Sequence, residues 1–444
     1  MTSTTKEFYH RMVLPQEIKS VISKQGIEIF MPETRAELLE MAMGGEGNMT
    51  FDVSYEVKGA GSVREAVVTK CKNGIVANYD DVYMRRRDPD CMVIADDLPT
   101  DKVTHEERFG KPFDEIRGAT FEWLSKQKQL LLMPFYSGNT DQKLGYASLL
   151  VCPANAAFFA AALADLQGFI PKSNLPNMYR PKAIIYVAPP FRHMYYEGKQ
   201  IVIHNRLFDM HEVFSYNLYP GPSAKKGIYG VLLNIGEQEK WVTLHASTVL
   251  VITPYELQFT ILHEGASGGG KSEMTQPFTR QADGRLLLAK NIIDGEKIML
   301  QIVDSSELHP VTDDMAIAHP SLNDREHNRL VVTDAENGWF LRVNHINRYG
   351  TEPETEYSTI HPKEPLVFFN MEATPGATCL LWEPVMDTPE KPCPNPRVII
   401  PREFIQNHVD EAVEIHVRSF GIRTPPCTKE KPSYGIVGMF HVLP

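Results

Sequence analysis

The segment Gly265–Ser272 reads GASGGGKS and directly follows the run QFTILH at Gln258–His263. It satisfies the pattern G-x-x-x-x-G-K-[ST] in the strand-then-loop context that this pattern requires. Glycines let backbone N–H groups converge on phosphate oxygens, the lysine neutralises the β- and γ-phosphates, and the serine hydroxyl suits Mg²⁺. The alternative is a flexible glycine loop without a ligand. The pattern favours a loop that binds a nucleoside triphosphate with Mg²⁺, formed by Gly265, Ala266, Ser267, Gly268, Gly269, Gly270, Lys271 and Ser272.

Length, charge and cysteine content restrict the classes of protein that the chain can belong to. A chain of 444 residues is long enough for two or three domains. The net charge of −11 argues against a general nucleic-acid binder. The six cysteines include no CxxC pair, which favours reduced thiols in a cytoplasm. The N-terminus lacks an apolar signal core, and the most apolar run, Ala156–Leu163, is too short to cross a bilayer. We therefore expect a cytoplasmic protein with no nucleic-acid or membrane partner.

Apolar patterns predict both helices and strands. Glu37–Met43 and Cys152–Leu166 are expected to be helical, and Leu130–Met133 and Ala183–Val187 to be buried strands. Ser137–Asp141 is expected to be a loop. From Gly227 onward strands dominate, and the candidates are Tyr229–Asn234, Trp241–Ser247, Val249–Thr253, Gln258–His263, Leu286–Leu288, Ile298–Val303, Leu330–Val332, Trp339–Val343 and Leu366–Asn370. The fold class is α/β or mixed α+β, with a boundary near residues 220–230.

The loop resembles those of two kinase families, HPr kinase/phosphorylase and phosphoenolpyruvate carboxykinase. HEGASGGGKSE also resembles an uncharacterised bacterial branch near the carboxykinases. Further segments resemble carboxykinase motifs in the same order along the chain. They are RDPDCMVIADD (Arg87–Asp97), FYSGNTDQKL (Phe135–Leu144), YPGPSAKKGIYGVLLN (Tyr219–Asn234), WVTLHAS (Trp241–Ser247), NPRVIIPREFI (Asn395–Ile405) and FGIRTPP (Phe420–Pro426).

The carboxykinase resemblance implies a two-domain fold. Residues 1–225 would form a substrate-binding domain, and residues 226–444 a nucleotide-binding domain that carries the loop. It further implies ATP or GTP as the nucleotide, Mg²⁺ at Ser272, and a small anionic carboxylate as substrate. We expect the region that completes the nucleotide-base pocket to be shortened or absent, because the chain ends at Pro444.

The resemblance also assigns roles to residues outside the loop. Arg87 would bind the substrate carboxylate, and Arg397, between Pro396 and Pro401, would contact the transferring phosphoryl group. Lys226, as a neutral amine, and His245 would bind a second metal, for which Mn²⁺ is the expected ion. Each has an ordinary alternative, namely a solvated basic run at Arg85–Arg87, a surface lysine, or a buried histidine that is satisfied by hydrogen bonds.

The sequence departs from the carboxykinase pattern just after the loop. Ser272-Glu273 stands where a Thr-Thr pair is usual, and the acidic pair normally close behind the loop is displaced. Asp313 and Asp314 in VTDD are the preferred metal ligands, and Asp334 in VVTDAENGW is the alternative.

Three functions remain open from the sequence. The first is a carboxykinase-like enzyme acting on an oxaloacetate-type or phosphoenolpyruvate-type acid, with Arg87, Lys226, Lys271 and Arg397 as its catalytic residues. The second is a kinase of another small acid or of a protein hydroxyl, which Ser272-Glu273 favours. The third is a nucleotide-binding regulator without activity.

Overall fold

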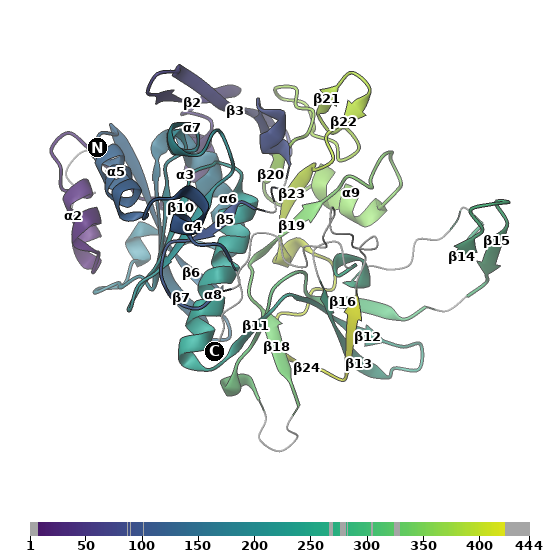
Figure 1. Cartoon of the computed structure of the whole chain (residues 1–444). Helices are drawn as coiled ribbons and strands as arrows, with labels where there is room; N and C mark the ends of the chain where they lie inside the picture. The colour runs from purple at the N-terminus through teal and green to yellow at the C-terminus, as the bar shows by residue number, and fades with distance from the viewer. Residues whose placement is uncertain are drawn as a thin grey trace. The chain divides into compact units, whose positions relative to one another are not determined.

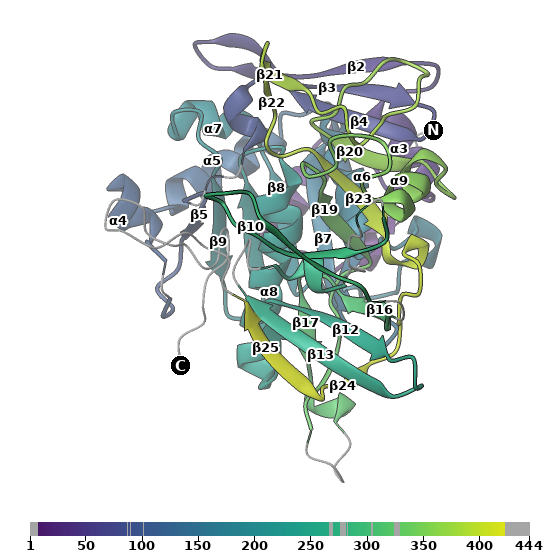
Figure 2. The same cartoon turned by 90° about the vertical axis from the view of Figure 1, so that its right-hand side faces the viewer.

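The computed structural model describes residues 8–86, 88, 90–100, 102–265, 270–275, 281, 283–302, 305–323 and 329–421. The chain divides into two compact units. Unit 1 comprises Met1–Lys240, Glu336–Ile405 and Ile436–Pro444, and unit 2 comprises Trp241–Ala335 and Gln406–Gly435. Both contain several sheets, and helices are numerous in unit 1, which confirms the mixed α/β class (Figures 1 and 2).

The larger sheet of unit 1 has seven strands. The β6–β7 and β10–β9 pairs are antiparallel and the other pairs are parallel. From edge to edge the strands are β1 (Glu28–Phe30), β6 (Gln129–Asn139), β7 (Leu144–Pro153), β8 (Ala183–Val187), β10 (His211–Ser215), β9 (Val202–Arg206) and β5 (Met92–Ile94).

Two of these strands test the sequence predictions. The predicted buried strands Leu130–Met133 and Ala183–Val187 are confirmed in β6 and β8. The prediction of a loop at Ser137–Asp141 is wrong for its first three residues. β6 pairs with β7 as far as Asn139 opposite Leu144, so the hydrogen-bonded ladder outweighs the local turn preference.

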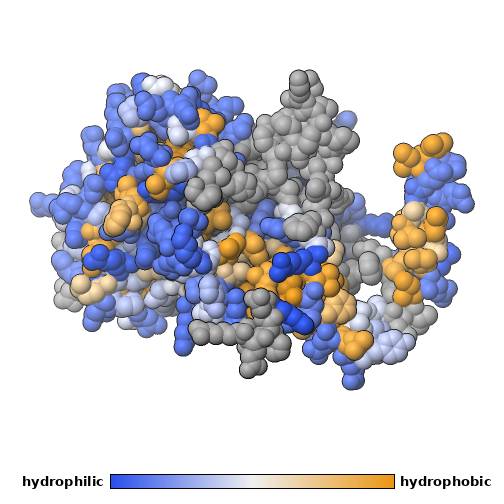
Figure 3. Space-filling view, turned by 60° about the horizontal axis from the view of Figure 1, so that its bottom comes forward, coloured by the Kyte–Doolittle hydropathy of each residue, from blue (hydrophilic) through white to orange (hydrophobic). Residues whose placement is uncertain are grey.

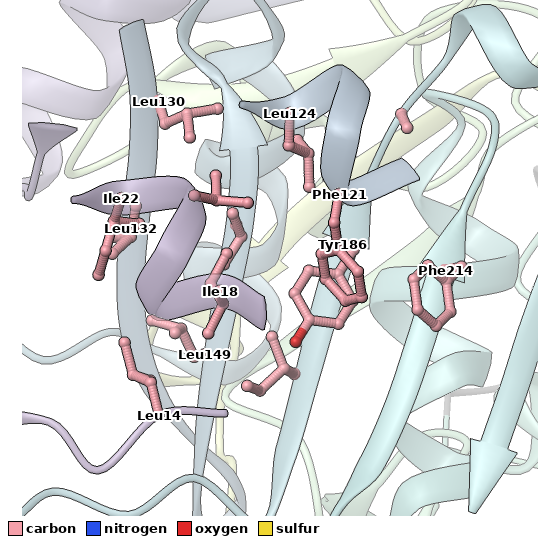
Figure 4. Close-up of a cluster of buried hydrophobic side chains, with 14 of the residues drawn as sticks. Leu14, Ile18, Ile22, Phe121, Leu124, Leu130, Leu132, Leu149, Tyr186 and Phe214 are labelled. Atoms are coloured by element: carbon pink, nitrogen blue, oxygen red, sulfur yellow. The ribbon is translucent and has the colours of Figure 1, made fainter. Parts of the chain in front are cut away.

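Two helices, α2 (Gln16–Ile22) and α5 (Asp114–Leu124), pack on one face of this sheet, where the main hydrophobic core lies. Figure 4 shows Ile18 and Ile22 from α2 and Phe121 and Leu124 from α5 meeting side chains of the strands. The strand side chains labelled there are Leu130, Leu132, Leu149, Tyr186 and Phe214.

The second sheet of unit 1 has six strands drawn from distant parts of the chain. Only the β20–β4 pair is parallel. The order is β19 (Gly338–Arg342), β23 (Arg397–Pro401), β20 (Leu366–Phe369), β4 (Gly74–Tyr79), β3 (Gly61–Cys71) and β2 (Thr50–Val57). A small ribbon, β21 (Met386–Thr388) with β22 (Lys391–Pro392), also belongs to unit 1.

Helix α6 (Ala157–Gln167) is buried along its whole length and contacts strands of both sheets, β6 and β7 of the first and β19 and β23 of the second. Its many alanines allow neighbours to come close. A Cβ at Gly338, the first residue of β19, would lie 2.2 Å from the carbonyl oxygen of Asp165, so this contact requires glycine. The predicted helix Cys152–Leu166 starts later than expected, because Cys152 and Pro153 still belong to β7.

The remaining helices of unit 1 are α3 (Arg35–Ala42), α4 (His105–Phe109), α7 (Pro190–Tyr195), α8 (Lys226–Glu239) and α9 (Pro353–Ile360). Helix α3 confirms the prediction at Glu37–Met43 to within its ends. The prediction of a strand at Tyr229–Asn234 is wrong, because these residues lie in α8. Ile228, Val231, Leu232 and Ile235 are buried at helical spacing, and a short apolar run could not distinguish the two periods.

Unit 2 is built almost entirely from strands. One four-stranded sheet runs β11 (Val242–Leu244), β17 (Ala316–Ala318), β18 (Val331–Asp334) and β24 (Val413–Glu414). The other runs β16 (Glu307–Thr312), β12 (Ala246–Ile252), β13 (Gln258–Gly265) and β25 (Val417–Gly421). A separate hairpin is formed by β14 (Leu286–Lys290) and β15 (Lys297–Leu300). These strands agree with most of the strand predictions after residue 240.

The division into units differs from the single boundary expected at residues 225 and 226. Helix α8 continues unit 1 as far as Lys240. Residues 336–405 return to unit 1, because β20 pairs with β4 and β19 and β23 extend the same sheet. Sequence patterns locate strands but do not reveal such returns. Among the described residues, no helix is both long and apolar enough to cross a membrane.

Candidate functional site

The loop predicted from GASGGGKS begins at the end of a central strand of unit 2. β13 ends at Gly265 and lies between β12, which is antiparallel to it, and β25, which is parallel. This confirms the predicted strand Gln258–His263. Ala266, Ser267, Gly268 and Gly269 lie outside the described residues. The chain continues at Gly270, whose φ of +87° favours glycine, and a 3₁₀ turn spans Ser272–Thr275.

Lys271 is buried and is held by two oxygen atoms. Its Nζ donates to the carbonyl oxygen of Gly265 at 2.9 Å and lies 3.3 Å from Oδ1 of Asp314. The first contact joins the two described ends of the loop. The ammonium group is therefore fixed beside the loop rather than extended into solvent.

Ser272 and Asp313 form the second contact of the loop. The serine hydroxyl donates to Oδ1 of Asp313 at 2.7 Å. Asp313 is buried and directly follows β16, whose last residue, Thr312, donates to the carbonyl oxygen of Ala246 at 3.0 Å. The neighbouring sheet thus positions the carboxylate next to the serine.

His245 lies between β11 and β12, so the predicted strand Trp241–Ser247 is interrupted at this residue. Its Nε2 is 2.8 Å from Oδ1 of Asp314, the same oxygen atom that lies beside Lys271. The backbone carbonyl of His245 accepts from the N–H of Gly265 at 3.3 Å, which ties the histidine to the start of the loop. Asp314 therefore connects the histidine to the loop lysine.

These five side chains are called the phosphate-loop cluster below: His245, Lys271, Ser272, Asp313 and Asp314. The alternative acid, Asp334, lies in β18 opposite Ala316. Asp313 and Asp314 each contact a residue of the loop, Ser272 and Lys271 respectively. Between Ser272 and Asp313 the chain forms the β14–β15 hairpin, which accounts for the displacement of the acidic pair.

Lys226 and Arg397 belong to unit 1. Lys226 is the buried first residue of α8, directly after a π-helical turn at Gly221–Lys225. Such turns are frequent at functional sites. The adjacent Lys225 places its Nζ 3.5 Å from Oε2 of the buried Glu336. Lys226 is thus buried, contrary to the ordinary alternative of a surface lysine. Arg87 lies outside the described residues.

Arg397 is the first residue of β23 and is held by its own sheet. Its Nε donates to Oδ1 of Asn395 at 2.8 Å, and Nη1 donates to the carbonyl oxygen of Phe340 at 3.0 Å. The guanidinium carbon lies 5.2 Å from the centroid of the Phe340 ring. Asn395 also donates to the hydroxyl of Tyr219 at 3.0 Å. The sequence reading missed Asn395, whose position two residues before Arg397 was the available signal.

Sequence reading also missed a buried histidine pair in unit 1. Nδ1 of His204, in β9, lies 2.8 Å from Nε2 of His211, in β10. Burial lowers the pKa of His204 to about 3 and lowers the pKa of His211 as well. Both imidazoles are therefore neutral at physiological pH. No spacing pattern marks such a pair, because it forms only when the two antiparallel strands pair.

The phosphate-loop cluster offers the ligands that divalent metals bound to phosphates use. A serine hydroxyl and a carboxylate are hard oxygen donors suited to Mg²⁺, which takes much of its remaining coordination from phosphates and water. His245 adds an imidazole, which suits Mn²⁺ together with carboxylate. Across the residues that the structure describes, no three His, Cys, Asp or Glu side chains converge as a ready-made metal site. The hydroxyl, carboxylate and imidazole groups of the cluster are nevertheless of the types that bind divalent metals.

The fold and the site define a mixed α/β protein in which a strand, a glycine-rich loop and a Lys-Ser pair meet a histidine and two aspartates. The pattern of a family described as a domain of unknown function (DUF4914) matches residues 14–444. The chain therefore belongs to this family. No curated protein matches the sequence.

Proposed function

We propose that this protein binds a nucleoside triphosphate with Mg²⁺ at Gly265–Ser272 and transfers its terminal phosphoryl group. The observation that carries the proposal is the 2.7 Å hydrogen bond between Ser272 and Asp313, formed beside Lys271 at the end of β13. In nucleotide-binding loops of this kind a Ser or Thr hydroxyl and an Asp hold Mg²⁺ together. Forty-one positions separate the two residues in the sequence, so their contact is not a consequence of local spacing.

Charge neutralisation and alignment account for most of the catalysis of phosphoryl transfer. Lys271 supplies a fixed positive charge where the β- and γ-phosphates would lie. Its present neighbours, the Gly265 carbonyl and Asp314, keep the ammonium group in place until phosphate oxygens replace them. The bound Mg²⁺ would neutralise charge that develops on the phosphates.

The reaction we favour is carboxykinase-like, in which decarboxylation of an oxaloacetate-type acid is coupled to its phosphorylation. His245 supports this proposal, because it lies in the cluster and shares Asp314 with Lys271. A histidine and an aspartate suit a second divalent ion such as Mn²⁺. Lys226 would complete that site, and Arg87 and Arg397 would bind the acid and the phosphoryl group. A guanidinium binds a carboxylate or a phosphate through two parallel hydrogen bonds.

A two-domain carboxykinase-like fold and a cytoplasmic location belong to the same proposal. The two units support the first, because the loop and its acids lie in one unit and Lys226 and Arg397 in the other. For the second, the buried cysteines Cys71, Cys152, Cys379 and Cys393 are free thiols in the structure. Free thiols are typical of a reducing compartment.

A kinase of another small acid or of a protein hydroxyl is the second candidate. Asp314 favours it, because a carboxylate that accepts from His245 and lies beside the loop lysine could also accept the proton of an attacking hydroxyl. Ser272-Glu273 favours it in the sequence.

The test begins with calorimetric titration of the protein with ATP and with GTP, each with Mg²⁺. We expect micromolar binding of at least one nucleotide that disappears when the metal is chelated. The protein is then incubated with that nucleotide, Mn²⁺ and oxaloacetate, and phosphoenolpyruvate is measured. Absence of binding of either nucleotide contradicts the whole proposal. Binding without phosphoenolpyruvate, but with phosphorylation of other acids or of protein hydroxyls, favours the second candidate.

A further inference from the structure

The β14–β15 hairpin is set apart from the rest of unit 2. Leu286 pairs with Leu300 and Lys290 with Lys297. Within the described chain, neither strand joins a further sheet. Figure 1 shows the hairpin apart from the two four-stranded sheets of unit 2. A two-stranded hairpin alone is marginally stable in water, so it needs a covering surface.

The hairpin exposes large aliphatic side chains. Ile292 and Ile293 in its turn are 96% and 91% exposed, and Leu288 and Ile298 in its strands are 63% and 54% exposed. The space-filling view of Figure 3 shows this apolar surface as orange patches on the projecting hairpin. Contiguous exposed apolar side chains mark sites of protein contact, and unpaired strand edges accept further strands.

The turn that displays the two isoleucines is well defined. Asn291 Nδ2 donates to Oδ2 of Asp294 at 2.9 Å, and the N–H of Glu296 donates to Oδ1 of the same carboxylate at 2.9 Å. Gly295 adopts a φ of +79°, which favours glycine. Ile292 and Ile293 are therefore held outward by a turn with its own hydrogen bonds.

The charges of the hairpin indicate what covers it. Residues 283–300 carry three basic side chains (Arg285, Lys290 and Lys297) and three acidic ones (Asp283, Asp294 and Glu296), with no net charge. Lys290 and Lys297 lie directly opposite each other, and such like-charge pairs destabilise a hairpin. The turn just beyond them carries two carboxylates. A nucleic acid or an anionic membrane would select a net positive surface instead.

We propose that this hairpin is an arm through which two copies of the chain associate. A two-fold arrangement brings the acidic turn of each arm to the lysine pair of the other, and the same contact is made twice. The apolar side chains of the two arms then cover each other. This inference does not depend on the proposed phosphoryl transfer.

Analytical ultracentrifugation of the full-length chain between about 1 and 100 µM measures its oligomeric state and so tests whether the arm forms a dimer. We expect the wild type to form a dimer, and the variant with Ile292→Asp and Ile293→Asp to be a monomer with an unchanged circular dichroism spectrum. Phe208→Asp is the matched control, because Phe208 is also fully exposed but lies in the β9–β10 turn of unit 1. It should leave the dimer unchanged. A monomeric wild type, or a dimer that survives the two Ile→Asp changes, overturns the proposal.

A charge exchange separates pairing of arms from general apolar association. The variant with Lys290→Glu and Lys297→Glu has an acidic arm, and the variant with Asp294→Lys and Glu296→Lys has a basic arm. Each alone should be monomeric through like-charge repulsion, and an equal mixture should form a mixed dimer that weakens with added salt. If each variant alone dimerises as well as the wild type, the arrangement of turn against lysine pair is wrong.

Discussion

The candidate functional residues of the two units differ in what their side chains contact. In unit 2, His245 and Lys271 both contact Asp314, and Ser272 contacts Asp313. In unit 1, Arg397 donates to Asn395, two positions before β23, and to the Phe340 carbonyl in the neighbouring strand β19. Candidates that contact each other form a site even without a ligand. A candidate residue such as Arg397, whose side chain is hydrogen-bonded to neighbouring parts of its own unit, is fixed in place. Its function depends on a ligand that binds beside it.

This comparison separates two kinds of variant. Changes in the phosphate-loop cluster should alter nucleotide binding itself. Changes in the unit 1 candidates should leave nucleotide binding nearly intact and alter only the use of the second substrate or of Mn²⁺. The predictions below test that separation, and they run from the largest expected effect to the smallest.

The largest effect is expected for Lys271→Ala. Charge-assisted hydrogen bonds contribute about 1.5–3 kcal/mol each, so loss of contacts to two phosphates should weaken ATP·Mg²⁺ binding by roughly 100-fold or more. Calorimetry measures the change, and an unchanged melting temperature shows that the variant is folded. Lys126→Ala is the control, because Lys126 is exposed in unit 1 and pairs with Glu122 on the surface. Unchanged affinity in folded Lys271→Ala would remove the nucleotide site.

The two adjacent aspartates should differ when each is changed to asparagine. Asp313→Asn removes the carboxylate beside the Ser272 hydroxyl and should weaken Mg²⁺-dependent nucleotide binding about tenfold. Asp314→Asn removes a negative charge beside Lys271 and His245, so it should keep or strengthen nucleotide binding while phosphoryl transfer is lost. Titration with and without Mg²⁺, and product formation at saturating nucleotide, measure the two effects. Equal loss of binding in both variants would refute distinct roles.

Arg87→Ala should reduce kcat/KM for the carboxylate substrate about tenfold, because one charge-assisted contact is lost. The Kd for ATP·Mg²⁺ should stay within about twofold. Arg348→Ala provides the comparison, since Arg348 is an exposed arginine of unit 1. If nucleotide affinity falls together with kcat/KM, Arg87 belongs functionally to the nucleotide site and the assignment of a carboxylate clamp fails.

The part of the candidate site that is formed by one continuous segment was the easiest to predict. The loop follows from spacing alone, because GASGGGKS comes directly after an alternating run that forms β13. Asp313 and Asp314 follow 41 and 42 positions after Ser272 and were chosen over Asp334 only through the resemblance to two kinase families. The β14–β15 hairpin separates them from the loop, and no local pattern indicates that the chain returns to it.

The errors in the fold prediction have a common cause. Tyr229–Asn234 has the glycine and branched side chains of a strand, yet Ile228, Val231, Leu232 and Ile235 form the buried side of α8. The division into units differs from a single boundary at residue 225 because β20 pairs with β4, and β23 and β19 extend the same sheet. Tertiary pairing decided both cases, and a short sequence window does not contain that information.

The smallest effect on nucleotide binding is expected for Lys226→Ala. Lys226 begins α8 in unit 1, and apart from Arg397 at the transferring phosphoryl group the triphosphate contacts that we propose lie in unit 2. The Kd for ATP·Mg²⁺ should therefore remain within about twofold of the wild type. Binding of Mn²⁺, followed by its paramagnetic resonance signal, should weaken about tenfold, as it should in His245→Ala. Lys19→Ala, an exposed lysine of α2, controls for loss of charge alone. If Lys226→Ala leaves Mn²⁺ binding unchanged while His245→Ala abolishes it, the second metal site belongs to unit 2 alone. The buried lysine then has a structural role, and the carboxykinase-like proposal loses a residue that its second metal site requires.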